Sequence, residues 1–334
     1  MKFSVVIATY NRAAELAETL KSLSALKTDK PWEVIVVDNN SSDDTQSTVA
    51  EAAKTFPVEL RYLFEKEQGR SAALNAGIRI AKGEIIVVTD DDVRVQPDWL
   101  ENAARAFEQL KCDYLGGKAL PIWGGPRPEW LPNRGGRHWA VIALLDYGPE
   151  PFELGERVPL GVNMAFRREA FERAGLFDNK IGRKAGTLLG QEVREWCQRA
   201  RTAGLRGFYS PDLVVQHVIP ADRLNRRYFR RWFYWHGVSR AILYETKGLD
   251  MESPERFSLD FSKVPHIAGV PRYLYRTCAS SFLSMLSSFF RRDAVARFEH
   301  ELWIWFFAGI VKQRWTNRHK PIAFRVNAPT LPNP

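Results

Sequence analysis

The sequence carries an unbroken run of β-branched residues straight into three aspartates, Glu84-Ile85-Ile86-Val87-Val88-Thr89-Asp90-Asp91-Asp92. Such a run is typical of a strand that is buried on both faces of a parallel sheet. Ligands of such sheets bind at the carboxyl ends of the strands, which is where these aspartates stand. Three adjacent carboxylates repel one another unless a divalent cation or several hydrogen-bond donors offset their charge. Taken alone, an acidic triplet also fits an ordinary solvated turn.

Apolar runs on the N-terminal side of this stretch extend the pattern to a whole sheet. Residues 3–8, 33–37 and 60–64 are further strand candidates, and amphipathic stretches such as residues 71–81 separate them. This alternation predicts an α/β fold with a mostly parallel sheet and helices on both faces. The first two strands also end in polar residues, so we expect one polar edge.

This polar edge lacks the usual glycine-rich phosphate loops. No Gly-x-Gly-x-x-Gly follows the first strand, and no Gly-x-x-x-x-Gly-Lys-[Ser/Thr] occurs in the sequence. A phosphate ligand must therefore be neutralised in another way. Carboxylates are preferred ligands of Mg²⁺ and Mn²⁺, which keep few protein ligands and leave positions for a diphosphate. The acidic triplet, with Asp38 at the end of a second strand, predicts a site for such a cation.

Four ordered motifs resemble those of the family 2 inverting glycosyltransferases. They are Phe3-Ser4-Val5-Val6-Ile7-Ala8-Thr9-Tyr10-Asn11-Arg12, Val34-Ile35-Val36-Val37-Asp38-Asn39-Asn40-Ser41-Ser42-Asp43-Asp44-Thr45, Gly69-Arg70-Ser71-Ala72-Ala73-Leu74-Asn75-Ala76-Gly77 and Thr89-Asp90-Asp91-Asp92. The resemblance covers the chain to about His217. It implies a GT-A fold with a Rossmann-like sheet, to which this chain adds a helical C-terminal extension.

The resemblance also implies roles for individual residues. The implied donor-binding residues are Thr9, Tyr10, Asp38, Arg70, Asp90 and Asp91. Among them, Asp90 is expected at the ribose and the first four around the nucleotide base. Asp92 and His217 are the implied ligands of Mn²⁺ or Mg²⁺. Plainer alternatives are packing at a strand end for Thr9 and Tyr10, a helix-surface position for Arg70, and a buried structural role for His217.

The catalytic base is expected in the second half of the fold. Inverting transfer needs a carboxylate that deprotonates the acceptor hydroxyl. The stretch Leu188-Leu189-Gly190-Gln191-Glu192-Val193-Arg194-Glu195-Trp196 is similar to the family's Gly-Glu-Asp motif, but it keeps only one acid of the usual pair. Glu192 is our candidate base, and Glu195 is the second choice. The alternative for both is an ordinary glutamate on a helix surface.

Weaker candidates contact the acceptor or its phosphate. Asn163 lies in a stretch similar to the family's acceptor-side strand, although a turn-capping role fits it equally well. Arg227, Arg230 and Arg231 belong to a basic, aromatic segment between residues 223 and 240 that contains no acid. Arginine matches phosphate bidentately. Tyr228 stands where processive synthases of the family carry glutamine, which favours transfer of a single sugar.

The charge is divided unevenly along the chain. The formal net charge is 48 − 39 = +9, of which residues 1–219 hold 29 − 30 = −1 and residues 220–334 hold 19 − 9 = +10. The alternative class is therefore a basic protein that binds nucleic acid or anionic membranes without transferase activity. The apolar run of residues 302–311 is about half the ~20 residues that span a bilayer. Three isolated cysteines favour a reducing compartment.

These observations predict a division of the chain and a function. Residues 1–219 form the glycosyltransferase domain: residues 1–118 bind the donor, and residues 119–219 carry the acceptor side with an irregular loop at 121–159. Residues 220–320 form a helical region and residues 321–334 a tail. We expect transfer of one sugar, from a UDP-linked donor, to a saccharide or lipid-linked hydroxyl in cell-surface polysaccharide or glycolipid assembly. The expected location is cytoplasmic, with peripheral contact at the inner membrane face through the C-terminal region. Its Trp303–Phe307 patch fits either that contact or a buried helix. No nucleic-acid partner is expected.

Overall fold

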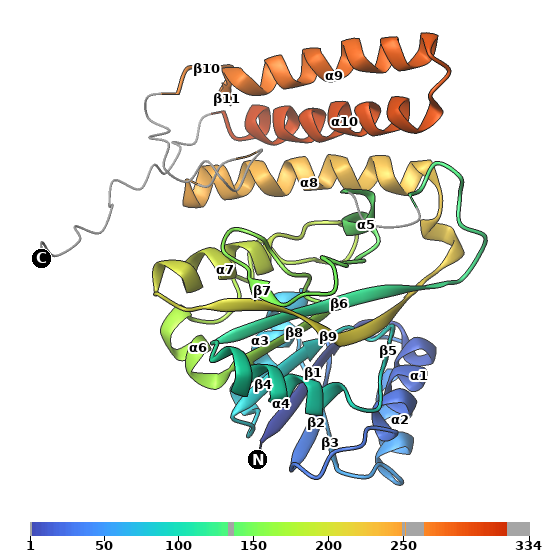
Figure 1. Ribbon diagram of the computed structural model, residues 1–334, viewed down its shortest axis with the longest axis vertical. Coiled ribbons are helices and arrows are strands. Elements are labelled where there is room, and N and C mark those ends of the chain that lie inside the picture. Colours follow the sequence, from blue (N-terminus) through green and yellow to red (C-terminus); the bar gives the residue numbers. More distant parts are fainter. Residues whose placement is uncertain (1, 133–136, 249–250, 252–263, 319–334) are drawn as a thin grey trace, which may run out of the picture. The chain divides into compact units, whose positions relative to one another are not determined.

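The predicted strand after Glu84 forms β4 (Ile85–Thr89) in the middle of the sheet. The computed structural model describes residues 2–132, 137–248, 251 and 264–318 (Figure 1). Within them, the chain divides into two compact units. We call Met1–Thr187 with Glu192–Asn225 the sheet unit, and Leu188–Gln191 with Arg226–Pro334 the helical unit. The predicted tail at 321–334 lies outside the described residues.

Nine strands form one sheet within the described residues of the sheet unit. They are β1 (Phe3–Thr9), β2 (Trp32–Asp38), β3 (Glu59–Phe64), β4, β5 (Val93–Val95), β6 (Tyr114–Trp123), β7 (Phe152–Glu153), β8 (Asn163–Arg167) and β9 (Gly207–Ile219). Their order is β3-β2-β1-β4-β8-β6-β9-β5, and β7 pairs with β9. Strands β1 to β4 are mutually parallel, whereas β8 runs antiparallel to β4 and β6. The predicted α/β fold is confirmed.

Helices cover both faces of this sheet, as the alternating pattern predicts. One face packs against α1 (Ala13–Ser24), α2 (Thr45–Ala53) and α4 (Trp99–Leu110). The other packs against α3 (Arg70–Ile80), α6 (Arg168–Ala174) and α7 (Glu192–Thr202). Because side chains alternate along a strand, Val5 and Ile7 join the first core and Val6 the second. Two short elements complete the unit, α5 (Arg137–Val141) and the 3₁₀ turn η1 (Ala221–Arg223).

Helix α3 packs tightly against β1 and β2 at Gly77. A Cβ atom at this position would stand 2.5 Å from Val6 Cγ1 and 2.9 Å from Val37 Cγ2. No larger residue fits without moving the helix away from β1 and β2. Since α3 follows the carboxyl end of β3, its N-terminus and Arg70 lie at the edge where ligands of parallel sheets bind.

The helical unit contains three long helices and a small hairpin. They are α8 (Arg226–Lys247), α9 (Arg272–Phe290) and α10 (Ala294–Thr316), with β10 (His266–Ile267) paired to β11 (Val270–Pro271). Helix α10 packs against both α8 and α9. Inside the unit, Arg314 Nη1 donates to Glu245 Oε1 at 2.7 Å. No helix in the described part of the chain is long and apolar enough to cross a membrane.

Most of the Trp303–Phe307 patch packs inside the helical unit. Phe306 is buried, and its ring contacts those of His236 and Trp303. Phe307 packs edge-on against Tyr275 of α9. Only Trp305 within this patch counts as exposed. The patch is therefore chiefly part of the packing between helices, in agreement with the alternative of a buried helix.

Candidate active site

The acidic triplet follows β4 and is tied to the end of β1. These two strands are parallel neighbours, so Thr9 and Asp91 lie at the same edge. Thr9 Oγ1 donates to Asp91 Oδ2 at 2.7 Å, and Arg12 Nη1 donates to Asp91 Oδ1 at 2.8 Å. Asp91 is buried. Its carboxylate therefore holds two strand ends together, and both of its oxygens are engaged.

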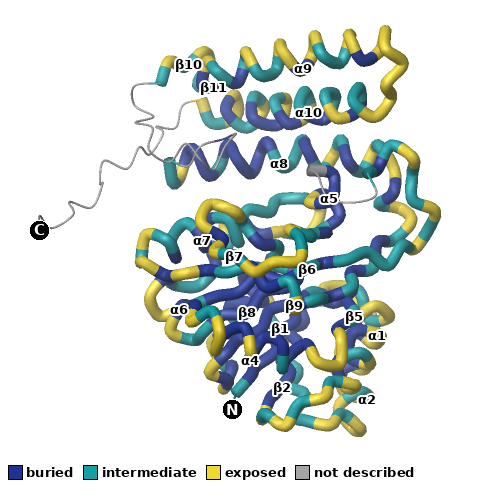
Figure 2. Tube along the Cα trace, in the orientation of Figure 1, coloured by how far each residue is buried: buried dark blue, intermediate teal, exposed yellow. Residues whose placement is uncertain are grey.

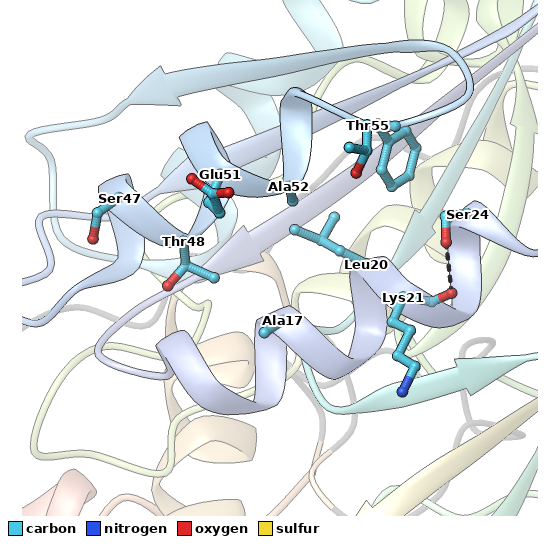
Figure 3. A pocket seen from close by; sticks show the side chains of 10 residues that line it. Ala17, Leu20, Lys21, Ser24, Ser47, Thr48, Glu51, Ala52 and Thr55 are labelled. Carbon is cyan, nitrogen blue, oxygen red and sulfur yellow. Dashed lines mark hydrogen bonds between the residues drawn. The ribbon is translucent and has the colours of Figure 1, made fainter.

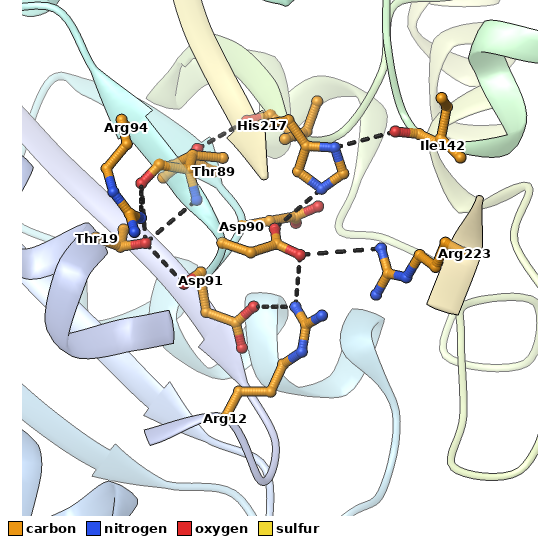
Figure 4. Close-up of polar contacts among 12 residues, drawn as sticks. Arg12, Thr19, Thr89, Asp90, Asp91, Arg94, Ile142, His217 and Arg223 are labelled. Carbon is orange, nitrogen blue, oxygen red and sulfur yellow. Dashed lines mark hydrogen bonds and ion pairs between the residues drawn. The ribbon is translucent and has the colours of Figure 1, made fainter. Parts of the chain in front are cut away.

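Asp92 meets His217 because β5 and β9 are paired. The register places Val93 opposite His217, and Val218 N donates to Asp92 O at 2.9 Å. Asp92 Oδ1 lies 3.1 Å from His217 Nε2, and both side chains are buried. Asp92 Oδ2 accepts from Arg12 Nη1 at 2.6 Å and lies 3.9 Å from Arg223 Nη1. Figure 4 shows Arg12 and Arg223 approaching the acidic group from different elements, with His217 above it.

The two neighbouring carboxyl groups differ in their protonation behaviour. Burial, aided by the charge of Asp92, raises the pKa of Asp91 to about 6 against the opposing effect of Arg12. Burial also acts to raise the pKa of Asp92, but His217 and Arg12 outweigh it and hold that pKa well below its usual range. Asp92 is thus the more firmly ionised of the pair, which suits a ligand for a cation.

The Asp92–His217 pair fits a divalent cation. His217 Nδ1 lies 3.0 Å from Ile142 O, and a carbonyl oxygen only accepts, so the Nδ1 atom carries a proton. Nε2 therefore faces the carboxylate either as a second N–H or across a bound cation. Adjacent ligands of an octahedral cation with bonds of about 2.1 Å stand about 3.0 Å apart, close to the observed separation. Within the described residues no group of three or more His, Cys, Asp or Glu side chains is placed to hold a metal, and Asp92 and His217 stay the two candidate ligands.

Arg70 joins two further carboxylates at the same edge. Its Nη2 donates to Asp90 Oδ1 at 2.6 Å, and its Nη1 donates to Glu192 Oε1 at 3.2 Å. A further bond from Nη2 to Gly161 O, at 2.9 Å, fixes the guanidinium plane. Burial alone would lower the pKa of Arg70, but Asp90 and Glu192 raise it above its ordinary value. Arg70 is therefore a largely buried bridge rather than a helix-surface arginine.

The two glutamates of α7 have different surroundings. Glu195 accepts two bonds from Arg199, from Nε and Nη2, each at 2.9 Å. Arg199 also donates to Leu176 O at 2.7 Å, so this pair fastens the segment after α6 to α7. Glu192, at the first position of α7, instead contacts Arg70 of the acidic edge. This geometry favours Glu192 over Glu195 as the base, and the assignment stays a prediction.

Of the residues expected around the nucleotide base, Tyr10 alone is open to solvent. Its side chain is 39% exposed, whereas Thr9 is buried against Asp91. Asp38 is also buried: its Oδ1 accepts from Ser41 N at 2.9 Å and its Oδ2 from Tyr62 OH at 2.8 Å. Burial and Asp38 raise the pKa of Tyr62 to about 12, so the phenol remains a donor. Tyr10 is thus the residue free to offer a ring face.

The weaker candidates either serve the fold or belong to the helical unit. Asn163 is fully buried; its Oδ1 accepts from Trp99 Nε1 at 3.1 Å, and its Nδ2 donates to two backbone carbonyls at 2.8 Å each. These three bonds use the side-chain amide, so we leave Asn163 out of the proposed site. In the helical unit, Arg230 pairs with Glu301 at 2.5 Å, while Arg227 and Arg231 are exposed.

Four residues of the site were not identified from the sequence. Arg12 and Arg223 face Asp92, Tyr62 faces Asp38, and the backbone of Ile142 holds His217. A signal existed for Arg12, because it closes the motif that follows the first strand. Tyr62 lies in the predicted strand at residues 60–64 and Arg223 begins the basic segment at residues 223–240, but neither pattern indicates which side chain the residue faces. Ile142 belongs to the irregular loop at 121–159.

A groove of about 650 Å³ lies between α1 and α2, on a helical face of the sheet unit (Figure 3). Its lining mixes apolar side chains such as Leu20 and Phe56 with Lys21 and Glu51. None of the predicted site residues lines it. We therefore locate the candidate site at the acidic edge and not in this groove.

The sheet is Rossmann-like, and its acidic edge holds an arginine-bridged carboxylate pair and a buried Asp–His pair. This combination is that of a glycosyltransferase of the GT-A class. The chain belongs to glycosyl transferase family 2, whose model matches residues 4–175. It is therefore an enzyme that transfers sugars, and a binding protein without transferase activity is no longer a tenable alternative.

Relatives and solved structures agree with this assignment. The glucosyl-dolichyl phosphate glucuronosyltransferase of Haloferax volcanii is 25% identical over 248 residues, covering 73% of this chain and 77% of its own length. The dolichol-phosphate mannosyltransferase of Pyrococcus furiosus is 29% identical over 302 residues, covering 88% and 80%. The fold is similar to that of a mannosyltransferase from Pyrobaculum calidifontis, solved with GDP-Man and Mn²⁺, with a TM-score of 0.60 and 20% identity over 94% of this chain and 87% of that one.

Proposed function

We propose that this protein is an inverting, cation-dependent glycosyltransferase that moves one sugar from a nucleotide-diphosphate donor to a hydroxyl acceptor. The observation that carries the proposal is the pairing at one sheet edge of Asp92 with His217, next to the Asp90–Arg70–Glu192 bridge. The first pair suits a cation for the departing diphosphate. The second places a candidate base beside a candidate ribose ligand.

Donor binding uses the ends of β1, β2 and β4. Tyr10 offers an exposed ring on which the base stacks. Asp38 accepts an N–H from the base while Tyr62 and Ser41 hold its carboxylate in place. Asp90, held by Arg70, accepts a ribose hydroxyl.

Asp92 and His217 would hold Mn²⁺ or Mg²⁺, and the bound cation would neutralise charge on the diphosphate as it leaves. Arg12 and Arg223 add positive charge beside the same carboxylate, within 2.6 and 3.9 Å. Arginine pairs readily with phosphate oxygens. We infer that these two side chains turn toward the diphosphate once a cation satisfies Asp92.

Glu192 is the proposed base. It takes the proton of the acceptor hydroxyl as that oxygen attacks the anomeric carbon; the bond from this carbon to the phosphate oxygen breaks, and the nucleoside diphosphate departs. One displacement from the opposite side inverts the anomeric configuration. The contact with Arg70, whose Nη1 lies 3.2 Å from Glu192 Oε1, orients the carboxylate before the acceptor arrives.

The comparisons support a nucleotide sugar and a lipid-linked acceptor. Two relatives are enzymes named for dolichyl or dolichol phosphate, and the Pyrobaculum structure contains GDP-Man with Mn²⁺. For this chain we propose a UDP-linked donor, as expected from the sequence, with a saccharide or lipid-linked acceptor. A lipid-linked acceptor would require work at a membrane surface, in line with the predicted peripheral contact.

A panel of UDP- and GDP-sugars tests the proposal without knowledge of the acceptor. Slow hydrolysis of the donor and the shift in Tm are measured with Mn²⁺, with Mg²⁺ and with EDTA. We expect one UDP-sugar to be hydrolysed and to stabilise the protein only when a cation is present. Preference for a GDP-sugar would revise the nucleotide, and hydrolysis unaffected by EDTA would contradict the role of Asp92 and His217.

A further inference from the structure

Helix α9 of the helical unit has small polar residues on its packed side and large apolar residues on its exposed side, which is the reverse of the usual pattern for a helix in water. The residues it buries include Leu274, Ser281 and Ser288, which recur every seven positions on the side packed against α10. Two of these three are small and polar, and Ser288 Oγ donates within the helix to Ser284 O at 2.8 Å. In water, the packed side of a helix is normally the apolar side. Small residues at a helix contact with large apolar ones outside are typical of helices in apolar surroundings.

The outer side of α9 carries the large apolar residues. We define the α9 apolar face as Phe282, Leu283, Leu286, Phe289 and Phe290. Leu283, Phe289 and Phe290 are 65%, 60% and 82% exposed. Figure 2 shows exposed residues recurring along the helix at each turn. Proteins in water rarely leave a contiguous apolar surface of this kind uncovered.

Arginines stand at both ends of the α9 apolar face. Arg272 and Arg276 are exposed. Residues three, four or seven positions apart lie on the same side of a helix. By this spacing the two arginines lie on the same side of α9 as Leu283, Leu286 and Phe290. Arg291 and Arg292, directly after the helix, are also exposed. Arg297 of α10 adds a further cation, 5.7 Å from the centre of the Phe289 ring.

No acid offsets these arginines within α9 itself. The helix contains no Asp or Glu. Asp293 follows at the start of α10, where its Oδ1 accepts from Ala296 N at 2.9 Å and so caps that helix. The stretch from Arg276 to Phe290 is about 21 Å long at 1.5 Å per residue. It thus presents an apolar strip of that length with basic ends.

We propose that the α9 apolar face docks into the interfacial layer of an anionic lipid bilayer. Phenylalanine and leucine side chains gain by leaving water for the boundary of the acyl chains, and the flanking arginines meet the phosphates of anionic headgroups. The positive charge selects a lipid surface over an apolar protein partner, because the face combines cations at both ends with no acid between them. The proposal stands on α9 and does not rest on the proposed reaction.

Flotation of the full-length protein with lipid vesicles tests this, without donor or metal present. Vesicles of phosphatidylcholine alone are compared with vesicles that also contain phosphatidylglycerol. The wild type is expected to float with the anionic vesicles, and less so as salt is raised. The triple variant Leu283→Ser, Leu286→Ser, Phe290→Ser should bind about tenfold more weakly or worse. Phe64→Ser, which changes an exposed apolar residue of the sheet unit, is the matched control and should bind as the wild type does.

A charge pair completes the test. Arg276→Gln with Arg291→Gln should weaken binding to anionic vesicles about tenfold and leave binding to neutral vesicles unchanged. Arg79→Gln with Arg105→Gln removes the same charge from exposed positions of the sheet unit and should have no effect. Absence of wild-type binding to anionic vesicles, or equal binding by the α9 variants, would overturn the proposal. The proposal would also be overturned if light scattering showed that the wild type is a dimer and the triple serine variant a monomer, because a second copy of the chain would then cover the α9 apolar face.

Discussion

The acidic edge of the sheet unit and the α9 apolar face of the helical unit differ in whether their charged side chains face partners of opposite charge. At the edge, the carboxylates of Asp91 and Asp92 face Arg12, and those of Asp90 and Glu192 face Arg70. On α9, large apolar side chains face outward and arginines stand beside them with no acid in the helix. The first surface is arranged for a charged ligand and the second for a medium of low polarity.

This difference separates chemistry from docking. The sequence up to residue 219 is almost neutral, at −1, and the remainder carries +10. The excess of basic charge therefore lies outside residues 1–219, the proposed donor-binding part, where a cation and Arg12 are expected to meet the donor's phosphates. Variants at the acidic edge should abolish the reaction and leave vesicle binding unchanged. Variants of α9 should weaken vesicle binding and leave donor hydrolysis unchanged.

The largest effect is expected from Asp92→Ala. This change removes one of two candidate cation ligands, and a loss of several kcal/mol in transition-state stabilisation corresponds to about a thousandfold fall in donor hydrolysis and transfer. Vesicle binding should remain at the wild-type level. Hydrolysis is measured with saturating Mn²⁺, and circular dichroism checks the fold. Full activity in this variant would show that the acidic edge is not the reaction centre.

Glu192→Gln should affect transfer next most strongly. Loss of a general base costs about a hundredfold to a thousandfold in kcat. Nucleotide affinity should change little, because Arg70 still holds Asp90. Glu195→Gln is the matched control: it breaks the pair with Arg199, so it should lower Tm and leave kcat near normal. A reversed result would make Glu195 the base.

Arg12→Met should mainly affect stability. Asp91 and Asp92 are buried and would lose a shared counterion, at a cost of about 2 kcal/mol, because Arg12 itself is only partly buried. Added Mn²⁺ should raise the Tm of this variant more than that of the wild type, since a cation replaces the missing charge. Arg79→Met, at an exposed site on α3, is the control. An equal response to Mn²⁺ in both proteins would argue against a cation at Asp92.

Tyr10→Ala should have the smallest effect of the series. Loss of a stacking ring is expected to weaken nucleotide binding about tenfold, in line with the 1–3 kcal/mol that base stacking on aromatic side chains contributes. Tyr10→Phe keeps the ring and should bind as the wild type. Calorimetric titration with the nucleotide diphosphate measures both. Equal affinity in all three proteins would place the base elsewhere.

Much of the fold was predictable because the information is local. An uninterrupted β-branched run such as residues 85–89 indicates a buried strand, and the residue that follows it must lie at the sheet edge. The acidic triplet and Asp38 were therefore placed by the strands that precede them. The antiparallel strand β8 between β4 and β6 could not be read in this way, because pairing between distant strands leaves no local pattern.

The partners of the site residues were harder to predict. Arg70 and Glu192 are 122 positions apart, and Asp92 meets His217 only through the register of β5 with β9. Contacts across such separations depend on how the whole chain is threaded, which residue types alone do not fix. On α9 the sequence shows the apolar residues, but which side of the helix packs against α10 decides that they are exposed.

One calorimetric measurement tests the central claim most directly. UDP is titrated into the wild type and into Asp92→Ala, first in the presence of Mn²⁺ and then in the presence of EDTA. The claim is that Asp92 and His217 hold a cation that joins the donor diphosphate to the acidic edge. We predict that the wild type binds UDP at least tenfold more tightly with Mn²⁺ than with EDTA, and that Asp92→Ala loses this difference. Equal affinity of the wild type under both conditions, or an undiminished Mn²⁺ effect in the variant, would contradict the account.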